Sequence, residues 1–264
     1  MPKQILYKYL DAQGAAGMLY NGNLQFTNAT YLNDPFDCHP GLIDFSQLSP
    51  EQAKPWGRED TILLKSDPFR RDRERAWICS LSKVRDSILM WTFYAKDHTG
   101  VCIGLDIEKV KPYLCPELGI MVDNSCYEVQ YRDIIDKPDY FKGQGSFYYQ
   151  MLTKAKEWEY EQEVRMFILD PSPWIMRLPP EPKHKWRKGL ADKLKKEEPK
   201  DWKGVRAYPD ISDDCFDAVY LGVNILPRHR SRIIEIAKER NPAIKIYQMR
   251  INPNALRLDF IEMV

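Results

Sequence analysis

Two glutamates near position 160 form the sequence feature with the clearest chemical potential. Glu161 and Glu163 stand two residues apart at the start of an otherwise apolar segment. Side chains two apart in a strand point to the same face, so both carboxylates would flank one small volume. Reduced solvation at such an edge raises a carboxylate pKa, which suits a general base or the stabilisation of a cation. The alternative is a solvated charged edge in which Glu163 pairs with a basic neighbour.

Two further segments offer groups that can hold a ligand. The proline within Asn33–Asp37 restricts that loop, which would present the Asn33 amide and the Asp34 carboxylate at a low entropic cost. Asp34 capping its own turn explains the same pattern. Lys8 lies between two tyrosines, the second being Tyr9, so its side chain points away from both rings and can hold a phosphate. Surface exposure is the simpler explanation for this lysine.

A short aromatic segment is the third candidate for ligand binding. Met90, Trp91 and Tyr94 fall near one face of the helix that we expect after Ser87. Such a wall can stack a nucleobase or a nicotinamide ring. Packing of the same side chains in the hydrophobic core is the alternative.

The segment 183–203 is strongly basic. It holds nine Lys or Arg against four Asp or Glu, together with two tryptophans. Cations that meet phosphates and rings that meet bases are typical of a nucleic-acid contact segment, although a solvated charged excursion has the same composition. We expect five residues to bind a substrate, one beside the glutamate pair and four in the basic run: Arg165, Lys185, Trp186, Arg187 and Lys188.

Composition restricts the classes of protein to consider. The 264 residues are 44% hydrophobic and 29% charged, as in a globular protein, and 39 basic side chains nearly balance 38 acidic ones. Any attraction for nucleic acid must therefore be local. The six cysteines form no CxxC pair and the four histidines no HxxxH pair, so we expect reduced, mostly buried thiols and no metal. Without a signal peptide or a run of about 18 apolar residues, we expect a cytoplasmic protein that makes no membrane contact.

The spacing of apolar residues predicts an α+β fold with strands alternating irregularly with helices. Strands are expected at 5–9, 24–27, 76–81, 100–107, 127–131, 163–169, 218–221, 244–249 and 256–263. Helices are expected from an Asp11 cap to a stop at Gly22, after Ser87, and at 108–114, 140–159 and 227–240.

The order of these elements favours one domain over residues 1–264, with a mixed, largely antiparallel central sheet. Regular βαβ alternation and repeats of 20 to 50 residues are both missing, which argues against doubly wound folds, barrels and solenoids. Residues 171–209 hold seven of the 19 prolines and include the basic run. We interpret this segment as an insertion or mobile excursion on the core.

Five segments together resemble the bacterial family catalogued as domain of unknown function 2971. They are Leu6–Tyr9, Asn33–Asp37, Met90–Trp91 with Tyr94, Trp158–Arg165 and Tyr220–Gly222. The resemblance spans nearly the whole chain. It implies a fold-length unit, whereas the family implies no particular reaction.

The order of the elements is also, more distantly, similar to ADP-ribosyltransferases, particularly those that act on nucleic acid. In that superfamily the first strand offers Arg or His to the NAD ribose, and a later Glu stabilises an oxocarbenium-like centre or activates the acceptor. The resemblance implies that Glu163 is catalytic and that Glu161 helps to orient the acceptor. Lys8 departs from the usual Arg or His, and Tyr94 is the candidate for the middle Ser or Tyr motif. The residues implied in NAD binding are Lys8, Tyr9, Asn33, Asp34, Trp91 and Tyr94.

The leading hypothesis is NAD-dependent transfer of ADP-ribose to a nucleic acid or a protein, without a metal, in which a fixed carboxylate stabilises positive charge on the ribose. A first alternative is a metal-dependent nuclease or phosphodiesterase, with magnesium bound by Asp34, Asp37, Glu161 and Glu163. A second is a non-catalytic module that binds nucleic acid or protein. A toxin, a phage-defence factor and a housekeeping enzyme are all compatible with the leading hypothesis.

Overall fold

The structure, a computed structural model, describes residues 3–55, 57–110, 122–169 and 206–263. Within these ranges ten strands form one sheet and two form a small parallel pair, β6 (Gln130–Arg132) and β7 (Thr153–Ala155). The strands of the large sheet are β1 (Ile5–Leu10), β2 (Phe26–Asn28), β3 (Ala76–Ser82), β4 (Val101–Asp106), β5 (Val122–Glu128), β8 (Glu163–Leu169), β9 (Arg206–Ala207), β10 (Phe216–Leu221), β11 (Lys245–Ile251) and β12 (Leu258–Glu262).

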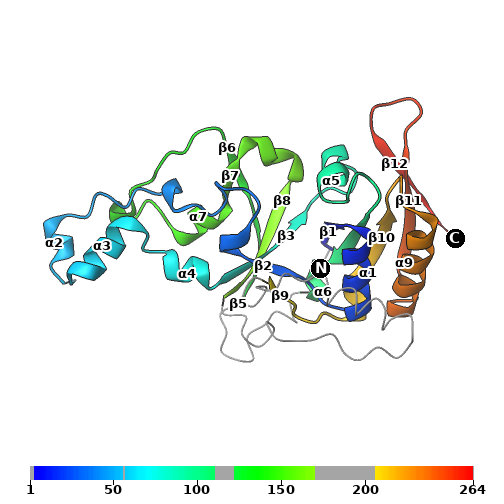
Figure 1. Ribbon diagram of the computed structural model, residues 1–264, viewed down its shortest axis with the longest axis horizontal. Helices are drawn as coiled ribbons and strands as arrows, with labels where there is room; N and C mark the ends of the chain where they lie inside the picture. The colour runs from blue at the N-terminus through cyan, green and yellow to red at the C-terminus, as the bar shows by residue number, and fades with distance from the viewer. Residues whose placement is uncertain (1–2, 56, 111–121, 170–205, 264) are drawn as a thin grey trace.

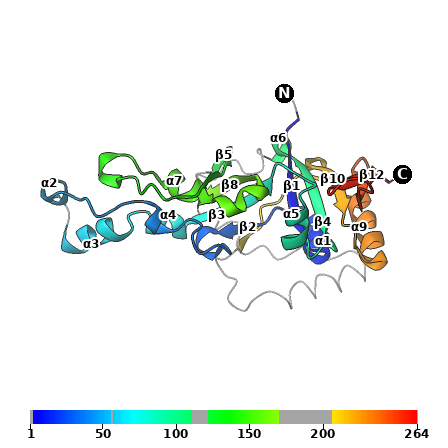
Figure 2. The same ribbon diagram turned by 90° about the horizontal axis from the view of Figure 1, so that it is seen from above.

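Helices lie at both ends of this sheet. The α-helices are α1 (Ala12–Asn21), α2 (Pro50–Ala53), α3 (Arg58–Ser66), α4 (Arg70–Glu74), α5 (Ile88–Phe93), α6 (Ile107–Val110), α7 (Phe147–Leu152) and α9 (Pro227–Arg240). The 3-10 helices are η1 (Ala29–Tyr31), η2 (Pro40–Leu42), η4 (Tyr140–Lys142), η5 (Lys156–Glu161) and η6 (Asp213–Cys215). In Figures 1 and 2, α2, α3, α4 and α7 extend from one end, and α1 and α9 pack together at the other. None of the described helices is long and apolar enough to cross a membrane.

The strand order confirms the predicted mixed, largely antiparallel sheet. It runs β12-β11-β10-β4-β1-β3-β2-β9, with β8 also paired to β3 and β5 paired to β8. Strands β10 and β11 are parallel, and the other pairs of the sheet are antiparallel. As expected for a central strand, β4 is buried at every position.

The edges of β3 determine where the sheet opens. One edge of β3 pairs with β8 along its whole length. The other edge is shared, because β1 pairs with it through Tyr7 and Ser82 while β2 pairs with it at Ile78 and Trp77. Ser80 lies between these two pairings. The sheet therefore separates beside Ser80, and side chains can enter the space between β1 and β2.

Local sequence signals explain the helices that cover one face of the sheet. Helix α1 begins at Asp11, whose side chain accepts a hydrogen bond from the Gly14 N–H, and it ends at Gly22 in the left-handed conformation with φ 64°. Helix α9 begins with a proline in its first turn, as predicted. Apolar side chains of both helices, including Leu19 and Ile233, join those of β4 and β10 in the main hydrophobic core.

The predicted helix over residues 140–159 is wrong. This stretch forms η4, α7, β7 and most of η5 instead. Gly143 ends η4 in a left-handed conformation, with φ 70°, and Ser146 is the N-cap of a new helix, α7. The predicted strand at 127–131 is likewise divided between β5 and β6. Four cysteines of the described residues are free and buried, as predicted, namely Cys38, Cys79, Cys102 and Cys215, and Cys126 is half-buried.

Gly222 lets β10 leave the sheet close to the loop after α5. A Cβ at this position would collide with the His98 carbonyl oxygen and lie 2.9 Å from that of Gly100. Both are backbone atoms that cannot move aside, so we expect Gly222→Ala to lower the free energy of unfolding by about 2 kcal/mol. Urea unfolding measures this change. Gly57→Ala, where the nearest atom lies 3.6 Å away, is the control that should leave stability almost unchanged.

Candidate functional site

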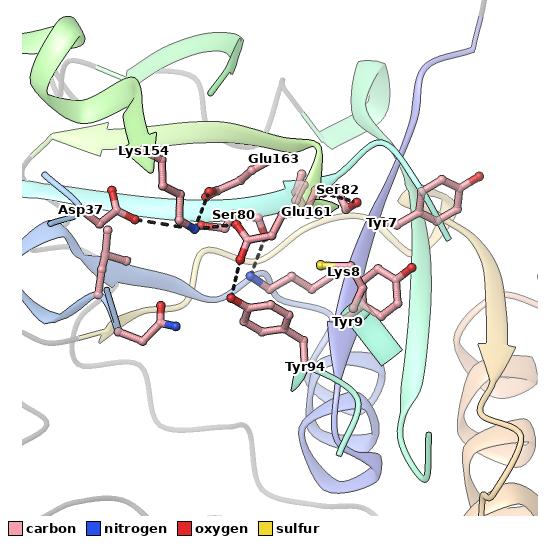
Figure 3. A pocket seen from close by; sticks show the side chains of 14 residues that line it. Tyr7, Lys8, Tyr9, Asp37, Ser80, Ser82, Tyr94, Lys154, Glu161 and Glu163 are labelled. Atoms are coloured by element: carbon pink, nitrogen blue, oxygen red, sulfur yellow. Dashed lines mark hydrogen bonds and ion pairs between the residues drawn. The ribbon is translucent and has the colours of Figure 1, made fainter. Parts of the chain in front are cut away.

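A cavity of about 120 Å³ opens where β1 and β2 separate along β3 (Figure 3). Six of the residues that the resemblance implied in catalysis or NAD binding line this cavity: Lys8, Tyr9, Asn33, Tyr94, Glu161 and Glu163. They come from β1, from the loop after η1, from α5 and from the junction of η5 with β8. The rest of the lining consists of Tyr7, Leu32, Asp37, Ser80, Leu81, Ser82, Met90 and Lys154. The opening strand and the glutamate pair therefore meet at one site.

Lys8 forms one wall of the cavity. Its ammonium Nζ donates to the Ser80 carbonyl oxygen at 2.9 Å, across the opening in the sheet. It forms no ion pair with any residue that the structure describes. An ammonium has three donors, so Lys8 retains hydrogen-bonding capacity toward the cavity.

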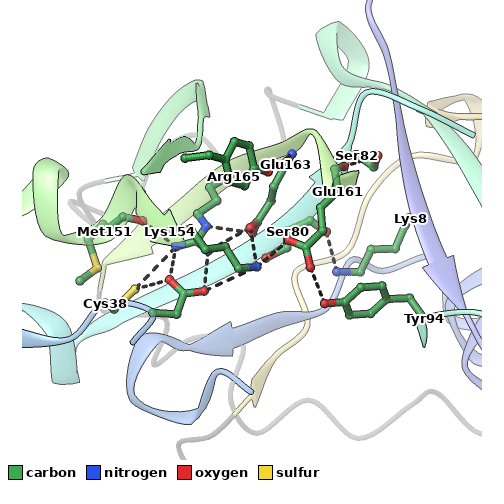
Figure 4. A network of polar contacts seen from close by, with 12 residues as sticks. Lys8, Cys38, Ser80, Ser82, Tyr94, Met151, Lys154, Glu161, Glu163 and Arg165 are labelled. Atoms are coloured by element: carbon green, nitrogen blue, oxygen red, sulfur yellow. Dashed lines mark hydrogen bonds and ion pairs between the residues drawn. The ribbon is translucent and has the colours of Figure 1, made fainter. Parts of the chain in front are cut away.

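Arg165 is the centre of a buried ion cluster behind the opposite wall (Figure 4). Its guanidinium binds Asp37 through two contacts, at 2.8 and 2.6 Å, and Glu163 through two more, at 2.8 and 3.0 Å. It also donates to the Met151 carbonyl oxygen at 2.6 Å. These contacts engage all five N–H donors of a guanidinium. We predicted Arg165 to bind a substrate, but its side chain is fully buried. It instead fixes the positions of Asp37 and Glu163.

Lys154 connects this cluster to the cavity, and it was missed in the sequence. Its Nζ lies 2.5 Å from Glu161, 3.1 Å from Glu163 and 3.9 Å from Asp37. The ammonium thus occupies the point among three carboxylates where the magnesium hypothesis requires a metal ion. Within the described residues, no group of three or more His, Cys, Asp or Glu is arranged to hold a metal.

The two glutamates have opposite electrostatic environments. Burial is the largest influence on Glu161 and raises its pKa above the usual value, although Lys154 opposes this. Burial also opposes ionisation of Glu163, but Arg165 and Lys154 outweigh it and hold the pKa of that carboxyl well below its usual range. Glu161 additionally accepts a hydrogen bond of 2.5 Å from the Tyr94 hydroxyl. Glu161 is therefore the carboxylate whose ionisation is costly, and Glu163 is the one that stays ionised.

The glutamates converge through a turn and not through strand alternation. Glu161 ends η5 and Glu163 begins β8, while Gln162 between them is left-handed with φ 42°. The Ser82 hydroxyl donates to the Glu161 carbonyl oxygen at 2.6 Å, and the Tyr131 hydroxyl accepts from the Glu163 N–H at 2.8 Å. These bonds fix the turn, so both side chains reach Lys154 despite the change of conformation between them.

Two of the residues predicted to bind NAD lie elsewhere. Trp91 is buried in the core, where its indole N–H donates to the Arg85 carbonyl oxygen at 2.8 Å, and Met90 lines the cavity instead. Asp34 accepts from the Phe36 N–H at 2.9 Å, which is the turn-capping role of the alternative interpretation. The predicted substrate-binding residues of the basic run lie outside the described residues: Lys185, Trp186, Arg187 and Lys188.

Glu163 makes the free energy of unfolding depend on pH in the acid range. Its pKa is lower in the folded chain than in the unfolded one, so the folded state binds fewer protons. Its contribution is complete above the unfolded value of about 4.3 and is lost as the pH falls below that value. We expect the free energy of unfolding to decrease between about pH 5 and pH 3 more steeply in the wild type than in Glu163→Gln. Urea unfolding across this range tests it, with the exposed Glu128→Gln as control, and equal slopes would contradict the ion-cluster assignment.

Fold and site define an α+β protein with a cavity lined by charged and aromatic side chains at an opening in its sheet, and with a buried ion cluster behind one wall. Residues 90–166 match the family model described as "Protein of unknown function (DUF2971)". The match supports the predicted resemblance to that family, and it contains these cavity and cluster residues: Tyr94, Lys154, Glu161, Glu163 and Arg165. No curated protein and no solved structure gave a significant match to the chain.

Proposed function

We propose that the protein is an NAD-dependent ADP-ribosyltransferase in which Glu161 is the carboxylate beside the reacting ribose. The charge of the buried cluster is the observation that carries this proposal. Among the described residues, Asp37, Glu161 and Glu163 pair with two buried cations, Lys154 and Arg165, so this cluster carries one net negative charge when all are ionised. The cluster forms the wall opposite the Lys8 ammonium. In a site that excludes water, such a charge stabilises a cation that develops next to it.

The proposed reaction uses this charge directly. The bond between ribose C1 and the nicotinamide nitrogen breaks, and its electron pair leaves with the nicotinamide. C1 becomes cationic and then bonds to a nucleophilic atom of the acceptor, whose proton passes to Glu161. The raised pKa of Glu161 favours this transfer, and Tyr94 fixes one carboxylate oxygen. Glu163, which the resemblance implied as catalytic, acts in this proposal by positioning Lys154.

The size of the cavity limits how NAD binds. A volume of about 120 Å³ is below the roughly 300 to 1,000 Å³ of pockets that enclose a whole small molecule. We therefore place only the nicotinamide and its ribose inside, with the adenosine part along the surface. Lys8, a cation without a carboxylate partner among the described residues, is suited to the diphosphate between them.

Incubation with labelled NAD tests the proposal. The purified protein is mixed with NAD labelled in its adenosine part and with DNA, RNA or protein, with and without a chelator. We expect transfer of label to one class of acceptor, release of nicotinamide, and no effect of the chelator. Cleavage of nucleic acid that needs no NAD and stops with chelator would select the metal-dependent nuclease or phosphodiesterase. Salt-sensitive binding without NAD consumption would select the non-catalytic module.

A further inference from the structure

Beside the cavity, two exposed apolar side chains of α5 lie next to two half-buried rings of η5, Trp158 and Tyr160. Leu89 and Phe93 of α5 are 43% and 64% exposed, and their spacing of four residues puts them on one helical face. The Phe93 ring lies 6.2 Å from that of Tyr160, which in turn lies 6.1 Å from that of Trp158. We call these four residues the aromatic row. Contiguous apolar surface of this kind marks an interaction site more often than isolated exposed residues do.

The aromatic row is attached to the cavity at three points. Two of its members directly precede Tyr94 and Glu161, which line the cavity and share a hydrogen bond of 2.5 Å. The third point is Lys154, whose Nζ lies 4.9 Å from the centre of the Trp158 ring while it pairs with Glu161. A molecule bound on the aromatic row would therefore lie next to the group that we propose to face the ribose.

Charges around the aromatic row indicate what kind of molecule it suits. Glu157 and Glu159 of η5 are exposed and form no ion pair with a described residue, whereas Lys156 between them is paired with Asp133 at 3.4 Å. The unneutralised charge of η5 is thus acidic, which repels phosphates and attracts lysine or arginine. The rings are also tilted by 42° and 40° to one another, so they form no flat surface for successive bases.

We propose that the aromatic row binds a polypeptide segment that carries apolar side chains next to lysine or arginine. Burial of the apolar side chains supplies the affinity, and Glu157 and Glu159 favour a segment with positive charge. A segment held there reaches the edge of the cavity beside Glu161 and presents an acceptor side chain to the sugar. That last step rests on the proposed function, whereas binding of the segment requires no NAD.

Fluorescence anisotropy with three labelled synthetic peptides and one single-stranded DNA tests the proposal. The peptides alternate Leu with Lys, Leu with Glu, or Ser with Lys. We expect only the Leu–Lys peptide to bind, less tightly at high salt, and Phe93→Ala to weaken it by about tenfold or more. Leu256→Ala is the matched control, since Leu256 is a fully exposed apolar residue of the β11–β12 loop. Neither replaced side chain is buried, so both variants should keep the thermal midpoint of the wild type.

Four results would overturn the proposal. They are equal binding of the Leu–Glu peptide, an unchanged affinity in Phe93→Ala, no binding of any peptide, and binding of the DNA that depends on Phe93. The last would assign the row to nucleic acid. Because anisotropy is recorded without NAD, the two proposals fail separately. A protein that binds the Leu–Lys peptide through Phe93 but consumes no NAD overturns the proposed function alone.

Discussion

Glu161→Gln is expected to reduce NAD consumption by about 100- to 1,000-fold, the range seen when one preorganised electrostatic contact to a transition state is removed. The amide keeps the shape of the side chain but removes the net negative charge beside the ribose. It also removes a buried carboxylate whose raised pKa shows that its ionisation is unfavourable. Stability at neutral pH should consequently fall little. Release of nicotinamide and the thermal midpoint, measured on the same sample, check both parts.

Glu128→Gln is the matched control for this experiment. Its side chain is 63% exposed and pairs with Lys83 outside the cavity. We expect it to consume NAD at the rate of the wild type. A Glu161→Gln variant that is folded and equally active would remove Glu161 from the mechanism and leave the buried cluster as a purely structural feature.

Arg165→Met is expected to cause the largest loss of stability, about 3 to 5 kcal/mol of unfolding free energy. The methionine fills most of the volume but leaves three buried carboxylates with Lys154 as the remaining cation of the cluster. Uncompensated buried charge carries this cost because desolvation is no longer offset by attraction. For a chain of this size the thermal midpoint should fall by roughly 10 °C. Urea unfolding and calorimetry measure the two quantities.

Two variants distinguish buried charge from charge in general. Arg165→Lys restores the charge but cannot form two paired contacts with each carboxylate, so its stability should lie between those of the wild type and Arg165→Met. Arg132→Met breaks the exposed pair with Asp136, four residues away, and should change stability little. Equal losses in Arg132→Met and Arg165→Met would mean that the cluster contributes no more than a surface ion pair.

Much of the fold could be predicted because its signals are local. The Asp11 cap and the Gly22 stop determine where α1 begins and ends. The Ser87 cap begins α5, and the apolar run of β4 identifies a strand covered on both faces. Antiparallel pairing follows from the irregular order of these elements. The predictions of the caps, the helix stop and the central strand each depend on residues that are neighbours in the sequence.

The buried cluster could not be predicted because its contacts are distant in the chain. Arg165 and Asp37 are 128 residues apart, and only the folded chain brings them together. Lys154 lies in a stretch with helical spacing, and that spacing concealed both its strand and its burial. The meeting of Glu161 and Glu163 was predicted from strand alternation, yet it is produced by the left-handed Gln162. Residue types thus indicated which groups matter, while their roles depend on partners far along the chain.

The short pairing of β1 with β3 places the walls of the cavity on two parts of the sheet that have few backbone bonds in common. Lys8 belongs to one part and Glu161 borders the other. A molecule that contacts both would link them, and the linked parts could then separate only after it dissociates. Its binding would raise the melting temperature in proportion to the logarithm of its concentration once the site is saturated. A thermal-shift screen of nucleotides can therefore find the ligand before any product of the reaction is known.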